Sequence, residues 1–406
     1  MGLVPLRRNR DFLLLQAGQL LSGAGTQSTA IAYPLLVLAT THSPAKAGLV
    51  SFARTLPLAV CALPFGLAAD RWRRKWLMIA ADAVRVAAIG TLAALIVTHH
   101  AGLMAISLIA LTEGIGTALF SAAAAGALRA TVPAGQLPAA AGAQTGRNAA
   151  VQLAGPSLGG ALFAVGRALP FAVDCASYTC STASLLAMRT PFEEPRELEP
   201  ASMRTRVTEG FTFLWQQPFL RTCALLFGLG NFIAPGLLFA VVVIGRQEGR
   251  SSAAVGLLVA AFAACILAGS FMAPLVRSRL TTRGVLLLEL WAWLGCATFL
   301  VWPNVYALTA GMLPAALAIP STDSVVHGYR IAMTPDRLLG RSEAVRTTIA
   351  LSIAPLGPLA AGLLLGTSAR ATITVFAAAA LVLALWGTTS SAIRDAPTQP
   401  KPAILQ

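Results

Sequence analysis

Apolar stretches long enough to cross a lipid bilayer recur along the whole of this 406-residue chain. One helical crossing of the hydrocarbon core takes roughly 20 mostly apolar residues. Twelve such stretches can be placed, and their apolar runs are too long and too continuous for β-strands. They cover residues 12–38, 46–68, 77–97, 102–124, 139–165, 169–188, 219–244, 251–275, 284–301, 305–327, 341–366 and 369–388. The sequence therefore predicts an all-α membrane protein with twelve transmembrane helices.

The composition agrees with a membrane protein and explains its basic charge. Hydrophobic residues make up 56% of the chain and charged residues only 11%, which is too little charge for a soluble protein of this size. The net charge is +14, and with a cytoplasmic start 21 of the 30 Lys and Arg fall on the cytoplasmic side. This positive-inside bias predicts an inner-membrane protein with both termini in the cytoplasm and no nucleic-acid partner.

A polar, proline-rich segment separates the twelve stretches into two sets of six. Residues 189–218 begin with a charged run and continue with apolar residues at helical spacing. This pattern predicts a cytoplasmic linker that contains an amphipathic helix at the membrane surface. The expected organisation is an N-terminal bundle (1–188), this linker, a C-terminal bundle (219–390) and a cytoplasmic tail (391–406).

The two halves resemble each other at an offset near 200 residues. Arg147 and Arg346 lie 199 residues apart, as do Pro156 and Pro355. A duplicated six-helix unit predicts two pseudo-symmetric bundles that rock about a central cavity, which is the mechanism of alternating access. The matched positions of the two arginines predict a shared structural role, in which each pairs across its bundle.

The loop after the second stretch carries the most specific motif. It reads glycine, then Ala-Asp-Arg, then a basic cluster, with its key residues at Gly66, Asp70, Arg71, Arg74 and Lys75. This pattern resembles the cytoplasmic signature between helices 2 and 3 of transporters of the major facilitator superfamily. The resemblance covers essentially the whole chain and implies the twelve-helix fold and secondary-active transport.

A second motif lies in the fifth stretch, where small residues follow one another at Gly155, Pro156, Gly159 and Gly160. It resembles the antiporter signature of the same superfamily, which implies export. Further motifs, including Ala53 to Pro57, resemble bacterial exporters related to enterobactin and macrolide efflux proteins. The resemblance implies a kinked interface between helix 5 and helix 8 that seals the cavity in one direction. Ordinary helix packing is the alternative.

The signature loop is expected to act as a gate. Asp70 would face the positive end of a helix in the opposite bundle, and the basic residues Arg71, Arg74 and Lys75 would pair with it or with anionic lipid headgroups. Gly66 would allow a close approach of that helix. Such a cluster forms only when the cytoplasmic side is closed. The alternative is a basic loop that only sets the topology.

Two places depart from the family pattern and leave the proton carrier open. Glu113 and Gly114 stand where Gln-Gly is frequent in helix 4, and the first helix lacks the Asp of related exporters. Glu113, placed near the midplane, is the leading candidate for proton coupling, with a structural hydrogen bond as the alternative. Asp323 and His327 share a helix face four residues apart and could relay protons, although they lie near a helix end.

The remaining intramembrane charges are expected to be structural. Asp82 and Arg85 should satisfy each other, and Asp174 could meet Arg54 or Arg167. The substrate cavity is expected to be weakly charged and to suit an apolar or amphipathic solute. Its candidate lining residues are Gln16, Gln19, Gln27, Asn231 and Phe232.

The sequence thus predicts proton-coupled export of a small amphipathic drug, antibiotic, siderophore or secondary metabolite by alternating access. An uptake permease of the same fold is one alternative, and a membrane-embedded receptor or enzyme is another. The expected partners are the solute, protons and membrane lipids. We expect a monomer without cofactor. No metal is expected either, because the six cysteines show no metal-ligand spacing.

Overall fold

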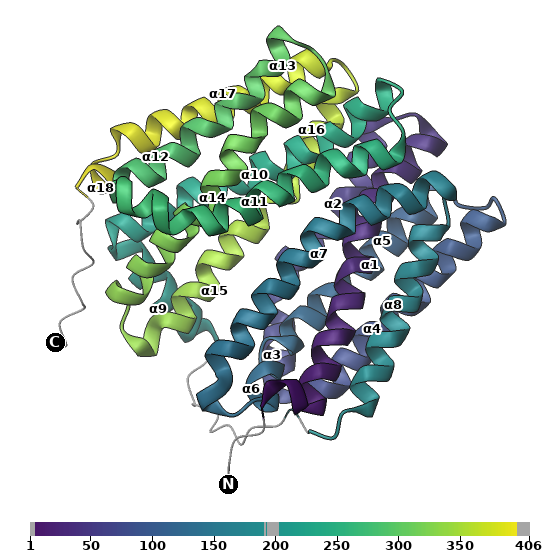
Figure 1. The fold of residues 1–406 in the computed structure, drawn as a ribbon, viewed down its shortest axis with the longest axis horizontal. Helices are drawn as coiled ribbons and strands as arrows, with labels where there is room; N and C mark the ends of the chain where they lie inside the picture. The colour runs from purple at the N-terminus through teal and green to yellow at the C-terminus, as the bar shows by residue number, and fades with distance from the viewer. Residues whose placement is uncertain (1–4, 191, 193–202, 396–406) are drawn as a thin grey trace. The chain divides into compact units, whose positions relative to one another are not determined.

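A computed structural model describes residues 5–190, 192 and 203–395 of the chain. All regular secondary structure in these ranges is helical. Part of the predicted linker (191 and 193–202) and the tail beyond residue 395 lie outside the described residues. Figure 1 shows the order of the helices from the N-terminus to the C-terminus.

The helices of the first half coincide with the first six predicted stretches. They are α1 (Arg10–Thr41), α2 (Pro44–Val60) continued by α3 (Ala62–Arg71), α4 (Arg74–Val97), α5 (Leu103–Ala124), α7 (Leu137–Val165) and α8 (Leu169–Ala187). Short elements in the connections are η1 (Leu6–Arg8), α6 (Ala127–Thr131) and η2 (Ala134–Gln136).

The second half begins with α9 (Met203–Gln216), where the sequence predicts the amphipathic helix. On α9, Leu214 is buried and the rings of Phe211 and Trp215 stack with centroids 5.1 Å apart. The six following segments are α10 (Pro218–Gln247), α11 (Ser252–Arg279), α12 (Thr282–Ala292) with η3 (Trp293–Ala297) and α13 (Thr298–Val301), α14 (Val305–Met333), α15 (Asp336–Ile353) with α16 (Leu356–Leu365), and α17 (Ala369–Thr389). A single turn, α18 (Ser391–Arg394), follows.

Prolines explain two interruptions that the sequence analysis did not anticipate. Pro64 has no N–H to donate to the carbonyl of Val60, and the helix breaks at Cys61, between α2 and α3. Pro355 separates α15 from α16 for the same reason.

Eight helical segments of the described chain have the length and hydropathy of a membrane span. The four predicted spans that fall short are α1, α2 with α3, α7 and α8, and all four belong to the first half. These segments carry most of the glutamine, hydroxyl and charged side chains that form the site described below. The polar residues of this site therefore explain the lower hydropathy of these four segments.

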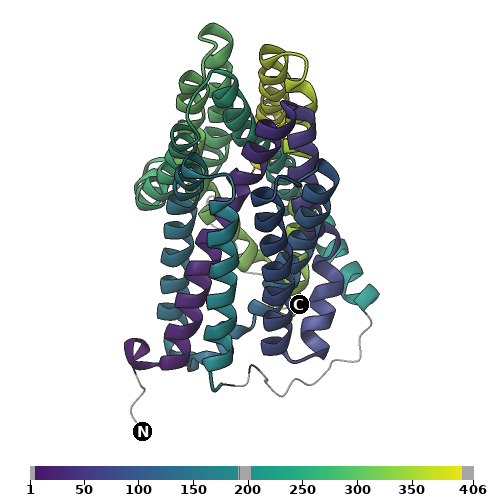
Figure 2. The ribbon, with the colours of Figure 1, turned by 90° about the vertical axis from the view of Figure 1, so that its right-hand side faces the viewer.

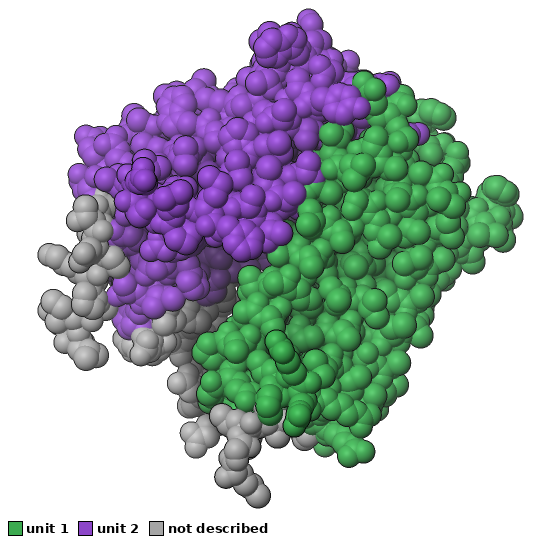
Figure 3. All heavy atoms as spheres, viewed as in Figure 1, with its two compact units in different colours: residues 1–197, 249–260 green, residues 198–248, 261–406 purple. Residues whose placement is uncertain are grey.

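The chain divides into two compact units (Figure 3). Unit 1 comprises residues 1–197 together with 249–260, the beginning of α11. Unit 2 comprises residues 198–248 and 261–406. The domain boundaries given by the sequence analysis stay predictions.

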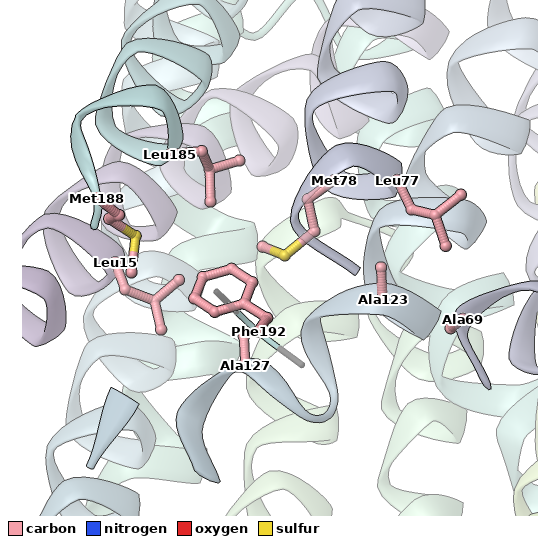
Figure 4. Close-up of a cluster of buried hydrophobic side chains, with 9 residues drawn as sticks. All are labelled: Leu15, Ala69, Leu77, Met78, Ala123, Ala127, Leu185, Met188 and Phe192. Carbon is pink, nitrogen blue, oxygen red and sulfur yellow. The ribbon is translucent and has the colours of Figure 1, made fainter. Parts of the chain in front are cut away.

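In unit 1, α1 packs between α7 and α8 (Figures 1 and 2). Glycines permit this close packing, because a Cβ at Gly159 of α7 would come within 2.9 Å or less of the backbone of Ser28 on α1. One end of the unit is closed by apolar side chains from α1, α3, α4, α5, α6, α8 and the segment after α8 (Figure 4). They are Leu15, Ala69, Leu77, Met78, Ala123, Ala127, Leu185, Met188 and Phe192.

In unit 2, α10 packs against α14, α15, α16 and α17. A Cβ at Gly357 of α16 would lie 2.9 Å from the backbone nitrogen of Gly236 on α10, so the two helices touch through their backbones. Gly295 of η3 and Gly311 of α14 approach each other in the same way.

Candidate transport site

A buried ion pair joins α2 to α5 in unit 1. Arg54 donates from Nε to Oε2 of Glu113 at 2.8 Å and from Nη2 to Oε1 at 2.9 Å, which is a bidentate arrangement. The Glu113 side chain is fully buried, and that of Arg54 is 13% exposed. Arg54 also donates to the carbonyl of Thr26 at 3.0 Å, and the hydroxyl of Tyr178 donates to Glu113 at 3.3 Å. The predicted acid at position 113 is therefore buried, but it is fully paired.

The Asp174 carboxyl group of α8 is buried close to this pair but has different partners. Thr29 of α1 donates to its Oδ2 at 2.9 Å, and Ser177 donates to its Oδ1 at 3.1 Å. No ion pair joins Asp174 to a Lys or Arg in the ranges that the structure describes. The expectation that Asp174 meets Arg54 or Arg167 is wrong, because Glu113 occupies the Arg54 guanidinium.

A second buried ion pair lies on α4, where Arg85 binds Asp82 three residues before it. The Arg85 guanidinium also lies against two rings, 4.4 Å from the centroid of Phe120 and 4.2 Å from that of Tyr178. These cation–π contacts and the ion pair fix the arginine at the side of a cavity.

This cavity in unit 1 has a volume of about 430 Å³, within the usual range for small-molecule sites. Its wall is rich in side-chain amides, and the predicted residues Gln19 and Gln27 belong to it. Two arginines also line it, Arg85 and Arg147, so the expectation of a weakly charged cavity is wrong for this part of the chain. The other amide side chains of the wall are Gln144, Asn148 and Gln152.

Arg147 of α7 makes all its recorded hydrogen bonds to neutral side chains. Its Nη1 donates to Gln16 at 2.7 Å and to Gln19 at 2.5 Å, both on α1. Its Nη2 donates to Asn148 at 2.9 Å. Gln16, a predicted cavity residue, is not part of the wall and instead contacts Arg147, which is.

Arg346 has a different environment from its counterpart in the first half. It pairs with Glu343, three residues earlier on the same helix, at 2.7 Å, and Arg330 of α14 pairs with the same carboxylate. Arg147 contacts α1 within its bundle, whereas Arg346 pairs on its own helix, so the two arginines have different partners and their shared role stays a prediction.

Unit 2 contains an acidic residue that the sequence analysis missed. Glu289 of α12 is buried, with 8% of its surface exposed, and lies beside Thr322 and Asp323 of α14. Glu289, Asp323 and the predicted Asn231 line a cavity of about 150 Å³. The signal was present, since Glu289 is the one acidic residue in the apolar stretch 284–301.

The other predicted residues of unit 2 are engaged locally. Nδ1 of His327 lies 2.5 Å from Nη2 of Arg330, and the proposed relay between His327 and Asp323 stays a prediction. Asn231 donates to the carbonyl of Phe227 at 2.9 Å. The ring of Phe232 stacks on that of Phe376 with centroids 5.0 Å apart.

The signature loop is held within unit 1. Arg74 donates to the carbonyl of Ala69 at 3.2 Å, and Lys75 donates to that of Met188 at 2.6 Å. Arg71 is exposed, and a Cβ at Gly66 would meet no described atom within 4 Å. The side chain of Asp70 lies outside the described part of the chain.

The antiporter-like residues of α7 lie at close backbone contacts. A Cβ at Gly155 would meet the side chain of Gln27 on α1. A Cβ at Gly160 would lie 2.9 Å from Cα of Gly256, at the beginning of α11, and one at Gly256 would lie 2.6 Å from the carbonyl oxygen of Pro156. The helices predicted as 5 and 8 thus touch through glycine, and the sealing function stays a prediction.

Residues 1–399 match the family model described as transmembrane secretion effectors of the major facilitator superfamily. The chain belongs to this family. It is 28% identical over 379 residues to the multidrug efflux pump Tap of Mycolicibacterium fortuitum, and the match covers 86% of this chain and 88% of the pump.

The fold is shared with solved transporters of low sequence identity. A bacterial homologue of the human lysosomal transporter Spinster superposes with a TM-score of 0.74 at 16% identity, over 96% of this chain and 98% of that one. The nucleoside transporter NupG (D323A mutant) gives 0.73 at 12% identity, over 93% and 99% of the two chains. A bacterial homologue of the iron transporter ferroportin gives 0.70 at 16% identity, over 95% and 99%.

These matches confirm the predicted fold class, twelve transmembrane helices in two six-helix bundles. The protein is a multi-pass secondary-active membrane transporter of small molecules, and the prediction that it is not an enzyme is confirmed by its family.

Proposed function

We propose that this transporter exports small amphipathic molecules from the cell, and that export is driven by protons moving inward. The observation that carries the proposal is the pairing of a polar cavity with buried carboxyl groups in unit 1, in a chain that is similar over most of its length to a multidrug efflux pump. The protein would act by alternating access in the inner membrane, with both termini in the cytoplasm.

The contacts favour Asp174 over Glu113 as the proton carrier. A carrier must gain and lose its proton without leaving another buried charge unpaired. Protonation of Glu113 would strip the buried Arg54 of its carboxylate, a loss of about 3–5 kcal/mol for buried pairs. Within the described ranges the Asp174 carboxyl group accepts hydrogen bonds from the hydroxyl groups of Thr29 and Ser177 and forms no ion pair, so its protonation leaves no cation behind.

The titratable groups around Asp174 lie on α1, α2, α4, α5 and on α8 itself. Arg54 and Glu113 balance each other on α2 and α5, and Arg85 is balanced by Asp82 on α4. The phenol groups nearby are Tyr33 on α1 and Tyr178 on α8. Asp174 is thus the carboxyl group of this cluster that lacks an ion-pair partner in the described structure, which supports its assignment as carrier.

Two further devices belong to the proposal. The loop containing Asp70 would stabilise the state closed to the cytoplasm, with Arg71 available to anionic lipid headgroups. The contact of Gly160 with Gly256 would keep α7 and α11 together while the cavity opens on one side only. The protein would work as a monomer.

Accumulation in whole cells tests export and its energy source together. Cells with and without the gene are loaded with a panel of amphipathic compounds, in the presence and absence of a proton uncoupler. We expect lower accumulation of at least one compound in cells that express the protein, and loss of this difference on uncoupling. Higher accumulation in expressing cells would identify an uptake permease instead.

A further inference from the structure

The cavity of unit 1 carries positive charge that the protein does not balance. Arg85 and Arg147 line it, and none of the described residues in its wall is Asp or Glu. Asp82 balances Arg85. The recorded partners of Arg147 are neutral amides, and no ion pair joins it to a carboxylate in the described part of the chain. A half-buried guanidinium of this kind attracts an anion.

The same site has hydrogen-bond donors in excess. Three side-chain atoms have no hydrogen-bond partner within the described protein: Nε of Arg85, Oγ1 of Thr117 and Nε2 of Gln16. Arg85 and Thr117 line the cavity, and Gln16 adjoins it through Arg147. A buried polar group without a partner costs about 1–3 kcal/mol, so a ligand with acceptor oxygens gains by meeting these atoms.

Neighbouring amides hold Arg147 in one orientation. Gln16 and Gln19 both accept from Nη1, and Asn148 accepts from Nε and Nη2. A guanidinium has five N–H donors, and this arrangement leaves the second N–H of Nη2 for a ligand. The arginine is therefore positioned in advance, which reduces the entropy lost on binding.

We propose that this cavity binds the acidic headgroup of the exported molecule, and that the substrate class is amphipathic carboxylates held by Arg147. The inference rests on the proposed export function and specifies its substrate. Phe120 and Val151 line the same cavity and provide apolar surface for the rest of the solute. The volume of about 430 Å³ accommodates a headgroup with part of its apolar body.

Binding to the purified full-length protein tests this without any transport step. The probes are dansylamino-undecanoic acid, its primary amide and the corresponding amine, which differ only in the headgroup, and dansyl fluorescence reports binding. We expect the wild type to bind the carboxylate most tightly. Arg147→Gln should weaken carboxylate binding by about 10-fold or more, the value of one charge-assisted hydrogen bond, and leave the amide unchanged.

Arg167→Gln is the matched control, because it removes the same charge from an exposed position outside the cavity wall. Its carboxylate affinity should equal that of the wild type. Arg147→Lys keeps the charge without the fork and should fall between wild type and Arg147→Gln. The headgroup order of the wild type also tests the proposal if Arg147→Gln fails to fold.

The substrate class is overturned if the wild type binds the amine or the amide as tightly as the acid. It is equally overturned if Arg147→Gln and Arg167→Gln bind the acid alike. Either result leaves proton-coupled export standing, because the proposed function is tested separately by accumulation in cells with an uncoupler.

Discussion

At the scale of single residues, the buried pair of Arg54 and Glu113 joins α2 to α5 in unit 1. The sequence placed both charges inside the membrane but could not pair them, because pairing depends on which helices are neighbours and how each is rotated. The same limit explains Asp174. Its burial could be predicted from the apolar stretch around it, whereas its hydroxyl partner Thr29 lies 145 residues away in the chain.

Breaking the Arg54–Glu113 pair from one side should destabilise the protein. Glu113→Leu leaves a buried arginine without its carboxylate, so we expect a loss of about 3–5 kcal/mol, seen as a lower thermal unfolding midpoint in detergent. Adding Arg54→Met should restore much of the lost stability, because no unpaired charge remains. A double variant as unstable as the sum of the single variants would show that the two residues do not interact.

The stability of unit 1 should depend on pH through Asp11, which lies near the N-terminus. Its Oδ2 accepts hydrogen bonds from the backbone N–H groups of Arg189 and Thr190 at 3.1 and 2.7 Å, and one from the Thr190 hydroxyl. Partial burial opposes ionisation, but these bonds outweigh it and lower the pKa of Asp11 from its ordinary 3.8.

This stabilisation should be fully present above pH 3.8, the ordinary value, and should be lost as the pH falls through the lowered folded-state pKa. Asp11→Asn should remove that loss, which is small because the site is partly exposed to solvent. The measurement is the thermal unfolding midpoint of the wild type and of Asp11→Asn in detergent, from pH values above 3.8 to values below the lowered pKa. Parallel pH profiles for wild type and variant would rule out the effect.

At the scale of helices, the sequence predicted the positions of the spans well, because a long uninterrupted apolar run satisfies its backbone hydrogen bonds in a bilayer by forming an α-helix. It failed where a helix changes course. The break at Cys61 follows from Pro64, which cannot donate a backbone hydrogen bond to the carbonyl of Val60. The role of Glu289 could not be predicted from its apolar stretch alone, because the cavity that it shares with Asp323 is formed by packing of α12 against α14.

The contact of α7 with the beginning of α11 should tolerate no side chain. Gly160→Ala would place Cβ 2.9 Å from Cα of Gly256, so we expect about 1–3 kcal/mol of destabilisation and reduced transport. Gly142→Ala, on the same helix, meets no described atom within 4 Å and is the control. Unfolding midpoints and export rates check both, and equal behaviour of the two variants would contradict the role of this contact.

At the scale of the whole molecule, the predicted topology follows from charge alone and needs a direct test. In a cysteine-free background, a membrane-impermeant thiol reagent should label Gly249→Cys, in the connection between α10 and α11, in intact cells. It should not label Ser391→Cys, in the exposed turn after α17, until the cells are opened. The reverse pattern would place both termini outside.

The central claim is that Asp174 links proton movement to export. Purified protein in proteoliposomes with an imposed pH gradient tests it most directly, with Asp174→Asn and Glu113→Gln compared with the wild type. We expect Asp174→Asn to keep exchange of substrate down its own gradient and to lose uphill transport and its dependence on pH. Glu113→Gln should retain uphill transport, at a lower rate because less of this variant is folded. Undiminished uphill transport by Asp174→Asn would contradict the account.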